Sequence, residues 1–325
     1  MSDFSARVYR LVFGAAAAYN IVFGLWASLA PQAFFDLFQL PPPRYPLIWA
    51  CLGMVVGLYG ALYAYGAWRL DRAFPLIAIG LAGKVLGPLG WLLAVRSGDF
   101  PLRTFPLIVF NDLIWWLPFG LFLLEGTAVK RFLARTAPWW CAALHLVALA
   151  GTAVLLRGGS EAVSDLQQRT AWLEAHRGQW RAGWLLWMAA AVSLTGFYAW
   201  WGSRVNRRPA LVALVIAWFG LMCDFAGESL FIASVPLPDS ALYRAATLLT
   251  GGAGNALYTL AGVLLTLVTP AMPPLLRRWA WVVWGSGAVL TLATIAGSAA
   301  GVVFSSAVLM ALFIPWVVLA GMRLR

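Results

Sequence analysis

Ten stretches of about 20 mostly apolar residues follow one another along this chain, and each is long enough to cross a bilayer as a helix. Backbone N–H and C=O groups cannot stay unpaired in hydrocarbon, so helices are the economical structure for such stretches. The composition agrees, because 62% of the residues are hydrophobic and 11% are charged, whereas soluble domains are roughly 25% charged. The sequence therefore predicts an all-α, polytopic integral membrane helical bundle with about ten transmembrane helices.

Short connections separate the apolar stretches and set the expected spans. These spans are residues 8–30, 46–68, 74–95, 105–124, 138–156, 182–201, 210–235, 241–269, 279–301 and 303–322. A basic linker at 129–137 divides them into a four-helix membrane domain, 1–128, and a six-helix membrane domain, 138–325. A five-plus-five inverted arrangement, as in many transporters, also fits the helix count, although no matching motifs support it.

The connections differ in their content of Lys and Arg, and this difference predicts the orientation. Alternate connections, counted with the termini, hold 14 basic residues on one side and 8 on the other. The richer side carries Arg7, Arg10, Arg69, Arg72, Lys130, Arg131, Arg135, Arg204, Arg207, Arg208, Arg277, Arg278, Arg323 and Arg325. The positive-inside rule makes this side cytoplasmic, so both termini are expected in the cytoplasm and the chain in the cell inner (cytoplasmic) membrane. The net charge of +11 then serves anchoring among membrane lipids, and no nucleic-acid partner is expected.

The longest connection, residues 157–181, is expected on the external side. Ser160 can cap a new helix after Gly158-Gly159. Four residues then follow at helical spacing, namely Val163, Leu166, Thr170 and Leu173. This pattern predicts an amphipathic external segment at 160–178 that lies along the membrane surface. The alternative interpretation is a lid over a binding site.

Four ionisable side chains lie inside the expected spans: Lys84, Asp112, Asp224 and Glu228. A charge in hydrocarbon costs roughly 2.5–3.5 kcal/mol on insertion scales, so such residues usually pair or face a cavity. Lys84 and Asp112 lie on helices joined by a short loop, and at a rise of 1.5 Å per residue their depths differ by only about 5 Å. We therefore expect their charged groups within about 4 Å of each other or bridged by one water.

The sequence around this pair differs from that of an ordinary apolar transmembrane helix. Gly83 and Gly87 form a small-xxx-small pair that would let another helix approach. Pro88 cannot donate to the carbonyl of Lys84 and should kink the helix there. Asn111, Trp115 and Trp116 accompany Asp112 on the next helix. Two interpretations follow: an ion pair that only fixes helix packing, or a polar pocket walled by the two tryptophans.

Several motifs of the first 126 residues occur together in this order. They are Tyr19-Asn20 with Trp26, Pro41–Pro43, Tyr45-Pro46 with Trp49, Gly53-Met54, Gly57, Tyr59-Gly60, Gly83-Lys84 through Gly87-Pro88, and Asn111-Asp112-Leu-Ile-Trp115-Trp116 followed by Pro118-Phe119. With these motifs, residues 1 to about 126 resemble an uncharacterised family of bacterial four-helix membrane proteins. The last two motifs are the most specific. The resemblance implies an architecture and no reaction, and the remainder of the chain shows no comparable resemblance.

The second part of the chain carries two carboxylates on one helix. Asp224 and Glu228 are four residues apart and share a face, where they repel each other, so at least one is expected to be protonated. Arg244 would be a peripheral partner for Glu228, which leaves the deeper Asp224 as the proton-exchanging residue. Asn255 could hydrogen-bond Asp224. It follows the glycine-rich segment 251–254, which lacks the strand and the GK[ST] ending of a phosphate loop and is expected to pack closely or to unwind.

Metal and cofactor sites are not expected. The two histidines, His145 and His176, are far apart. We expect His145 to be a hydrogen-bonded interior residue and His176 to be solvated. The three cysteines, Cys51, Cys141 and Cys223, all lie in apolar stretches and are expected to be buried thiols.

Three classes of function remain open from the sequence. The leading hypothesis is a membrane protein that binds or transports a small or amphipathic molecule, with protonatable carboxylates coupled to its movement. The first alternative is an integral membrane enzyme acting on a lipid, isoprenoid or quinone-like substrate, with Asp224, Glu228 or His145 as acid and base. The second alternative is a structural accessory protein. The candidate ligand or proton site residues are Lys84, Asn111, Asp112, Trp115, Trp116, Asp224, Glu228 and Asn255.

Overall fold

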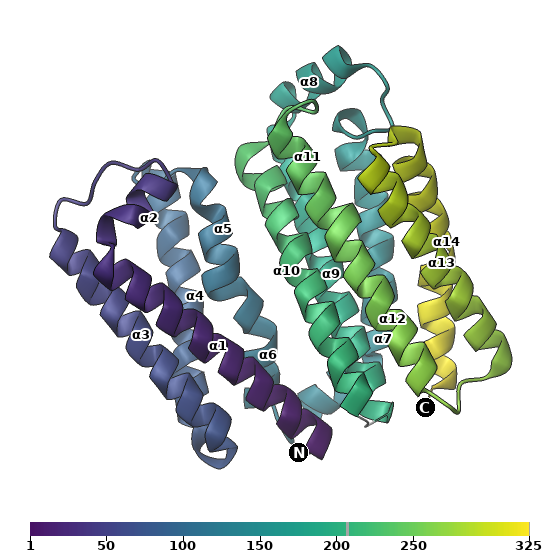
Figure 1. Cartoon of the computed structure of the whole chain (residues 1–325), viewed down its shortest axis with the longest axis horizontal. Coiled ribbons are helices and arrows are strands. Elements are labelled where there is room, and N and C mark those ends of the chain that lie inside the picture. Colours follow the sequence, from purple (N-terminus) through teal and green to yellow (C-terminus); the bar gives the residue numbers. More distant parts are fainter. Residues whose placement is uncertain (206–207, 325) are drawn as a thin grey trace. The chain divides into compact units, whose positions relative to one another are not determined.

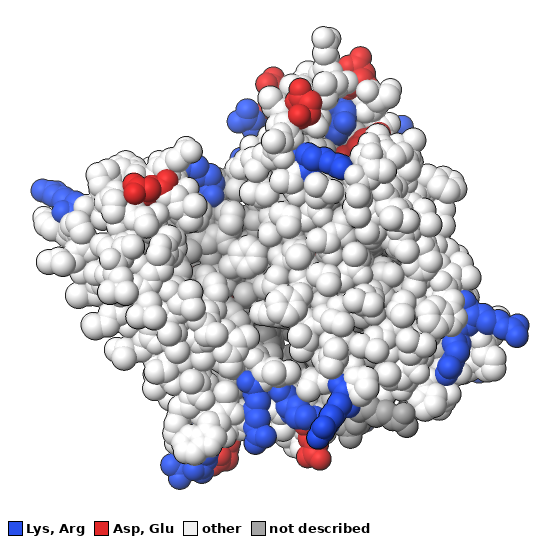
Figure 2. Space-filling view, in the orientation of Figure 1, with Lys and Arg blue, Asp and Glu red and all other residues white. Residues whose placement is uncertain are grey.

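A computed structural model describes residues 1–205 and 208–324, and this part of the chain is helical without strands (Figure 1). Ten of its helical segments are long and apolar enough to cross a membrane. In the space-filling view, charged residues gather at the two ends of the helices and leave a broad uncharged band between them (Figure 2). The predicted all-α polytopic fold is therefore confirmed. Arg207 and Arg325, two of the basic residues used for the orientation, lie outside the described residues.

The chain forms two compact units, Met1–Lys130 and Arg131–Arg325. The first unit contains four of the spanning segments and the second contains six, which is not a five-plus-five division. Residues 129–137 do not form a separate connection. They are the first turns of α7 (Ala128–Gly151), a helix that continues through Pro138.

In the first unit, α1 and α3 make the most extensive packing contact. The elements are α1 (Asp3–Leu29), α2 (Pro31–Leu37), α3 (Pro46–Trp68), η1 (Leu70–Arg72), α4 (Ala73–Ser97), η2 (Leu102–Thr104), α5 (Phe105–Ile108), η3 (Val109–Leu113) and α6 (Ile114–Leu123). Gly24 of α1 lies against Gly53 and Gly57 of α3, where a Cβ on Gly24 would be 2.6 Å from both the Gly53 carbonyl oxygen and the Gly57 nitrogen. The two backbones meet here because none of the three residues has a side chain.

This contact predicts a large difference between two glycines of the same helix. Gly24→Ala should destabilise the protein by about 1–3 kcal/mol, because the new methyl group meets rigid backbone. Gly14→Ala should be neutral or stabilising, because no atom lies within 4 Å of a Cβ there and alanine has the higher helix propensity. Denaturant unfolding of both variants in detergent measures the difference. Equal stability of the two variants would contradict the close α1–α3 packing.

The second unit is a bundle of six spanning segments with a short helix over one end. Its elements are α7, η4 (Thr152–Leu156), η5 (Arg157–Gly159), α8 (Leu166–Ala175), α9 (Arg177–Val205), α10 (Arg208–Ser234), α11 (Ala241–Thr247), η6 (Leu248–Gly254), α12 (Asn255–Val268), α13 (Pro274–Ala296) and α14 (Ala299–Arg323). The segments η3, η4 and η6 are π-helical. Such turns are rare and are frequently found at functional sites.

Helix α8 differs from the expected external segment. It begins at Leu166 rather than near Ser160, because Asp165 is the N-cap and accepts a hydrogen bond from the Gln168 N–H over 2.9 Å. Its Leu173 is only 1% exposed and belongs to a buried cluster with Leu156, Trp180, Phe231, Tyr243 and Ala246. The segment is therefore packed on the end of the bundle and does not simply lie along the membrane surface.

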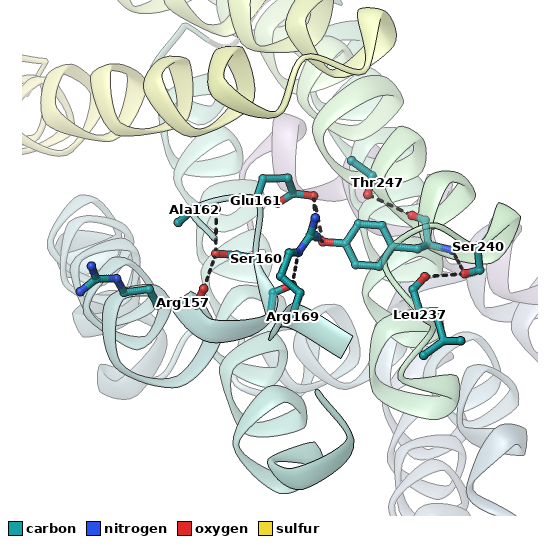
Figure 3. A network of polar contacts seen from close by, with 10 residues as sticks. Arg157, Ser160, Glu161, Ala162, Arg169, Leu237, Ser240 and Thr247 are labelled. Atoms are coloured by element: carbon teal, nitrogen blue, oxygen red, sulfur yellow. Dashed lines mark hydrogen bonds and ion pairs between the residues drawn. The ribbon is translucent and has the colours of Figure 1, made fainter. Parts of the chain in front are cut away.

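A buried polar network fixes α8 to α11 (Figure 3). The Arg169 Nη2 donates to the Tyr243 hydroxyl over 2.8 Å, and that hydroxyl donates to Glu161 Oε1 over 2.8 Å. Arg169 also lies 3.8 Å from the same carboxylate oxygen. The sequence spacing held no indication of this network, because Tyr243 is 74 residues from Arg169 and 82 residues from Glu161.

Candidate functional site

The buried Lys84–Asp112 pair is the centre of the candidate site in the first unit. Lys84 of α4 is 5% exposed and Asp112 of η3 is 4% exposed. The Lys84 Nζ lies 4.0 Å from Asp112 Oδ1, so the predicted distance is confirmed. The Nζ also donates to the backbone oxygen of Asn111 and lies 5.9 Å from the centre of the Trp115 ring. One ammonium group is thus held by a carboxylate, a carbonyl and an aromatic face.

The π-helical turn η3 explains why a backbone carbonyl is free to accept from Lys84. A π turn shifts the hydrogen-bond register away from the regular i→i+4 pattern, and Asn111 lies in the middle of this turn. The Asn111 Nδ2 donates to Asp112 Oδ1 over 3.0 Å. The Asn111 Oδ1, however, is buried and has no partner among the described residues.

Pro88 lies within α4, and its missing N–H affects the carbonyl of Lys84. Helix α4 continues from Ala73 to Ser97 through Pro88. Since proline has no N–H, the carbonyl of Lys84 loses its usual donor four residues on. The Trp116 Nε1 of α6 replaces it and donates to the Lys84 oxygen over 2.8 Å. The proline therefore frees a carbonyl that joins α4 to α6.

The two tryptophans have separate roles. Trp115 is 2% exposed and faces the Lys84 ammonium, whereas Trp116 is 39% exposed and binds backbone. They do not wall one pocket together. The two glycines differ as well. A Cβ on Gly87 would lie 3.3 Å from Asp112 Oδ2, so this glycine allows the carboxylate to approach α4, whereas Gly83 faces open space.

An apolar groove of about 570 Å³ lies beside this pair in the first unit. Its walls come from one face of α1, the end of α2 and the start of the fourth span: Ala18, Tyr19, Val22, Phe23, Trp26, Leu37, Phe38, Pro106, Leu107 and Phe110. The Tyr19 ring lies 6.2 Å from the Trp115 ring. Tyr19, which lines the groove, therefore contacts the same Trp115 ring that faces the Lys84 ammonium.

In the second unit, Asp224 and Glu228 lie on α10 in different surroundings. The Tyr258 hydroxyl donates to Asp224 Oδ2 over 3.3 Å, and Asp224 is partly exposed. Glu228 is 1% exposed, and its Oε2 has no partner among the described residues. The predicted Glu228–Arg244 ion pair is wrong. Arg244 instead donates to the carbonyl oxygens of Thr294 and Ile295 over 2.8 and 2.6 Å.

Asn255 does not bind Asp224, in contrast to the interaction considered from the sequence. Its Nδ2 donates to the Gly287 oxygen over 2.6 Å and to Thr291 Oγ1 over 2.9 Å, so it joins α12 to α13. The glycine-rich segment before it is π-helical rather than unwound. Close packing is confirmed at Gly254, where a Cβ would lie 3.3 Å from the Cβ of Asp224.

The histidines and cysteines that the sequence singles out lie in surroundings that do not form a binding site. The His145 Nδ1 lies 2.8 Å from the Cys141 oxygen in a buried position, as expected for an interior histidine. His176 is only partly exposed and stacks on Trp172, so it is less solvated than expected. Cys51 is exposed on the surface of its helix rather than buried. Among the described residues, no group of three or more His, Cys, Asp or Glu could hold a metal ion.

Comparison of the chain with protein-family models, with curated proteins and with solved structures finds no match.

Proposed function

We propose that this chain binds, and helps to move, a small amphipathic molecule within the cell inner membrane. The polar end of the molecule would lie at Asn111 and the Lys84–Asp112 pair, and its apolar end in the groove of the first unit. The proposal extends the resemblance of residues 1 to about 126 to bacterial four-helix membrane proteins by assigning those motifs a ligand. In line with the positive-inside rule, we propose that both termini of the chain lie in the cytoplasm.

The observation that carries the proposal is the unpaired Asn111 Oδ1. A buried acceptor without a donor costs about 1–3 kcal/mol, and low dielectric raises that cost. A hydroxyl or amide N–H of a ligand would satisfy it. Since the Lys84 ammonium already offsets the Asp112 carboxylate, the ligand that fits best is a neutral hydrogen-bond donor rather than an ion.

The groove supports an apolar tail on the same ligand. Its volume of about 570 Å³ lies within the range of roughly 300–1,000 Å³ that is usual for small-molecule sites. Phe110, which lines it, directly precedes Asn111. Since the Asn111 Oδ1 is buried, we propose that its side chain turns toward the groove when an aliphatic alcohol or a lipid with a hydroxylated head group binds.

The carboxyl pair of the second unit fits the proton-coupled part of this function. Two carboxylates one helical turn apart cannot both be ionised in hydrocarbon at moderate cost. Asp224 has a phenol donor and partial exposure, whereas Glu228 is sealed. We infer that the pair retains one proton and that Asp224 is the member that exchanges it.

A photoreactive fatty alcohol tests the binding proposal on the purified full chain. Ala18→Trp fills the exposed groove and should lower the saturable labelling affinity about tenfold or more, which corresponds to roughly 1.4 kcal/mol. Asn111→Leu removes the acceptor and should lower it about three- to tenfold. Leu11→Trp is the matched control, because Leu11 is exposed on α1 but does not line the groove. Equal labelling of Ala18→Trp and Leu11→Trp would overturn the proposal.

A further inference from the structure

One end of the second unit is basic and contains no acidic residue. Segments 131–140, 202–210, 269–279 and 321–325 make up this end, and they contain no Asp, Glu or Lys. We call it the arginine end, and its described arginines are Arg131, Arg135, Arg204, Arg208, Arg277, Arg278 and Arg323. Arg131, Arg204 and Arg277 have interactions within the protein; Arg277 donates to the Thr269 oxygen, and the Arg204 guanidinium lies 4.0 Å from the centre of the Trp200 ring. Arg135, Arg208, Arg278 and Arg323 are exposed.

Packing between the helices brings this end together. A Cβ on Gly321 of α14 would lie 2.7 Å from the Pro138 Cβ of α7. The Trp316 Nε1 donates to the Leu276 oxygen at the start of α13 over 3.1 Å. The Trp201 Nε1 of α9 donates to Thr269 Oγ1 over 3.0 Å. Arg135, Arg278 and Arg323 therefore extend from helices that meet one another, and Arg208 begins α10, which packs against α9 and α12.

Several basic residues elsewhere in the chain pair with carboxylates. In the first unit, Arg69 pairs with Asp71 at 2.9 Å and Lys130 pairs with Glu125. At the opposite end of the second unit, Arg169 lies 3.8 Å from Glu161. The arginine end cannot form such side-chain pairs within its own segments, because they contain no Asp or Glu. Its counter-charges must come from outside the unit.

We infer that the arginine end binds the phosphate groups of anionic phospholipids. It lies at the end of membrane-spanning helices, at the level where head groups are found, and Trp139, Trp140 and Trp279 flank it as interfacial anchors. The guanidinium fork binds phosphate oxygens in a bidentate way, which a lysine ammonium cannot do. An Arg or Lys beside an anionic membrane surface contributes about 1 kcal/mol, so four exposed arginines give a marked preference for anionic lipid.

The test titrates the purified full chain in detergent with phosphatidylglycerol or with phosphatidylcholine of the same acyl chains. Bound lipid is counted by native mass spectrometry, and the apparent affinity is taken from thermal stabilisation. We expect phosphatidylglycerol to be retained and to stabilise, and phosphatidylcholine to do neither. Inorganic phosphate at the same concentration should not stabilise, because it lacks the tails that hold the phosphate at the membrane surface.

Two double variants that remove the same net charge show which end of the second unit binds the lipid. Arg278→Gln with Arg323→Gln should weaken phosphatidylglycerol binding roughly 25-fold, about fivefold for each arginine. Arg157→Gln with Arg177→Gln, at the opposite end of the unit, should leave it unchanged. Both doubles replace exposed side chains, and their stability without lipid checks that they fold. Equal binding of the two lipids, equal losses in the two doubles, or stabilisation by phosphate alone would each overturn the inference.

Discussion

Lys84→Met should destabilise the protein by about 3–5 kcal/mol, because it leaves the Asp112 carboxylate buried without its cation. Asp112 is 4% exposed, and among the described residues only Lys84 places a basic group within ion-pair distance of it. Lys130→Met is the control in the same unit. Lys130 and its partner Glu125 are 18% and 27% exposed, so water can solvate the stranded carboxylate and we expect a loss of about 1 kcal/mol. Denaturant unfolding in detergent measures both changes.

The double variant Lys84→Met with Asp112→Leu should be more stable than Lys84→Met alone. Replacing both members of a buried ion pair by apolar residues is often neutral or better. The free energy of unfolding should stay about 1 kcal/mol below that of the wild type, because Lys84 also donates a hydrogen bond to the Asn111 carbonyl. That oxygen would lose its donor in the double variant. If the double variant were worse by the sum of the two single changes, the two residues would not be coupled and the pair would not organise this site.

The fold of this chain follows from hydrophobic length, which the sequence displays directly. Hydrocarbon excludes every structure but the helix for a 20-residue apolar stretch, so the spanning segments could be located from composition alone. Their ends were less predictable. Helix α7 starts at Ala128 instead of Pro138, so the proline lies inside the helix and does not mark its first turn. Helix α8 starts at Leu166 because Asp165 and not Ser160 meets the free N–H groups.

The pairing of Lys84 with Asp112 was predictable because both sequence distance and depth pointed to it. The surroundings of the pair were not, since they depend on the register of the π turn and on the carbonyl that Pro88 frees. No pattern of residue types indicates where a helix will shift by one residue. The unpaired Asn111 Oδ1 lies within that turn and became visible only in three dimensions.

The incorrect Glu228–Arg244 pair has a physical cause that applies beyond this residue. The last carbonyls of a helix have no intrahelical donor, and in this chain arginines supply one. Arg103, Arg181, Arg244 and Arg277 each donate to carbonyl oxygens at or just beyond the end of another helix. These carbonyls compete with carboxylates for the same guanidinium groups. Counting opposite charges along the sequence overlooks that competition, because backbone acceptors do not appear in a sequence.

Because Glu228 does not pair with Arg244, the expected effects of replacing the two carboxyl groups of α10 change. Glu228 is sealed from solvent and its Oε2 has no donor, so a neutral side chain of the same shape fits the site equally well. Glu228→Gln should therefore leave the free energy of unfolding within about 1 kcal/mol of the wild type, since it removes no hydrogen bond to a charged partner. Asp224 accepts a hydrogen bond from the Tyr258 hydroxyl and is partly exposed. Its carboxyl group can therefore exchange a proton with its surroundings.

Asp224→Asn should consequently abolish proton exchange in the second unit while the protein still folds. Asparagine retains an oxygen that can accept from Tyr258, but it cannot release or take up a proton. Infrared difference spectra between acidic and alkaline pH, recorded on the purified variants, contain carboxyl bands from every titrating Asp and Glu. The band of the exchanging residue should be present in the wild type and in Glu228→Gln and should be missing from Asp224→Asn. Thermal unfolding of the same samples provides the control for structure. If the band persists in Asp224→Asn and disappears in Glu228→Gln, then Glu228 is the exchanging residue. If Asp224→Asn unfolds the protein while Glu228→Gln does not, then Asp224 stabilises the contact between α10 and α12 and carries no proton.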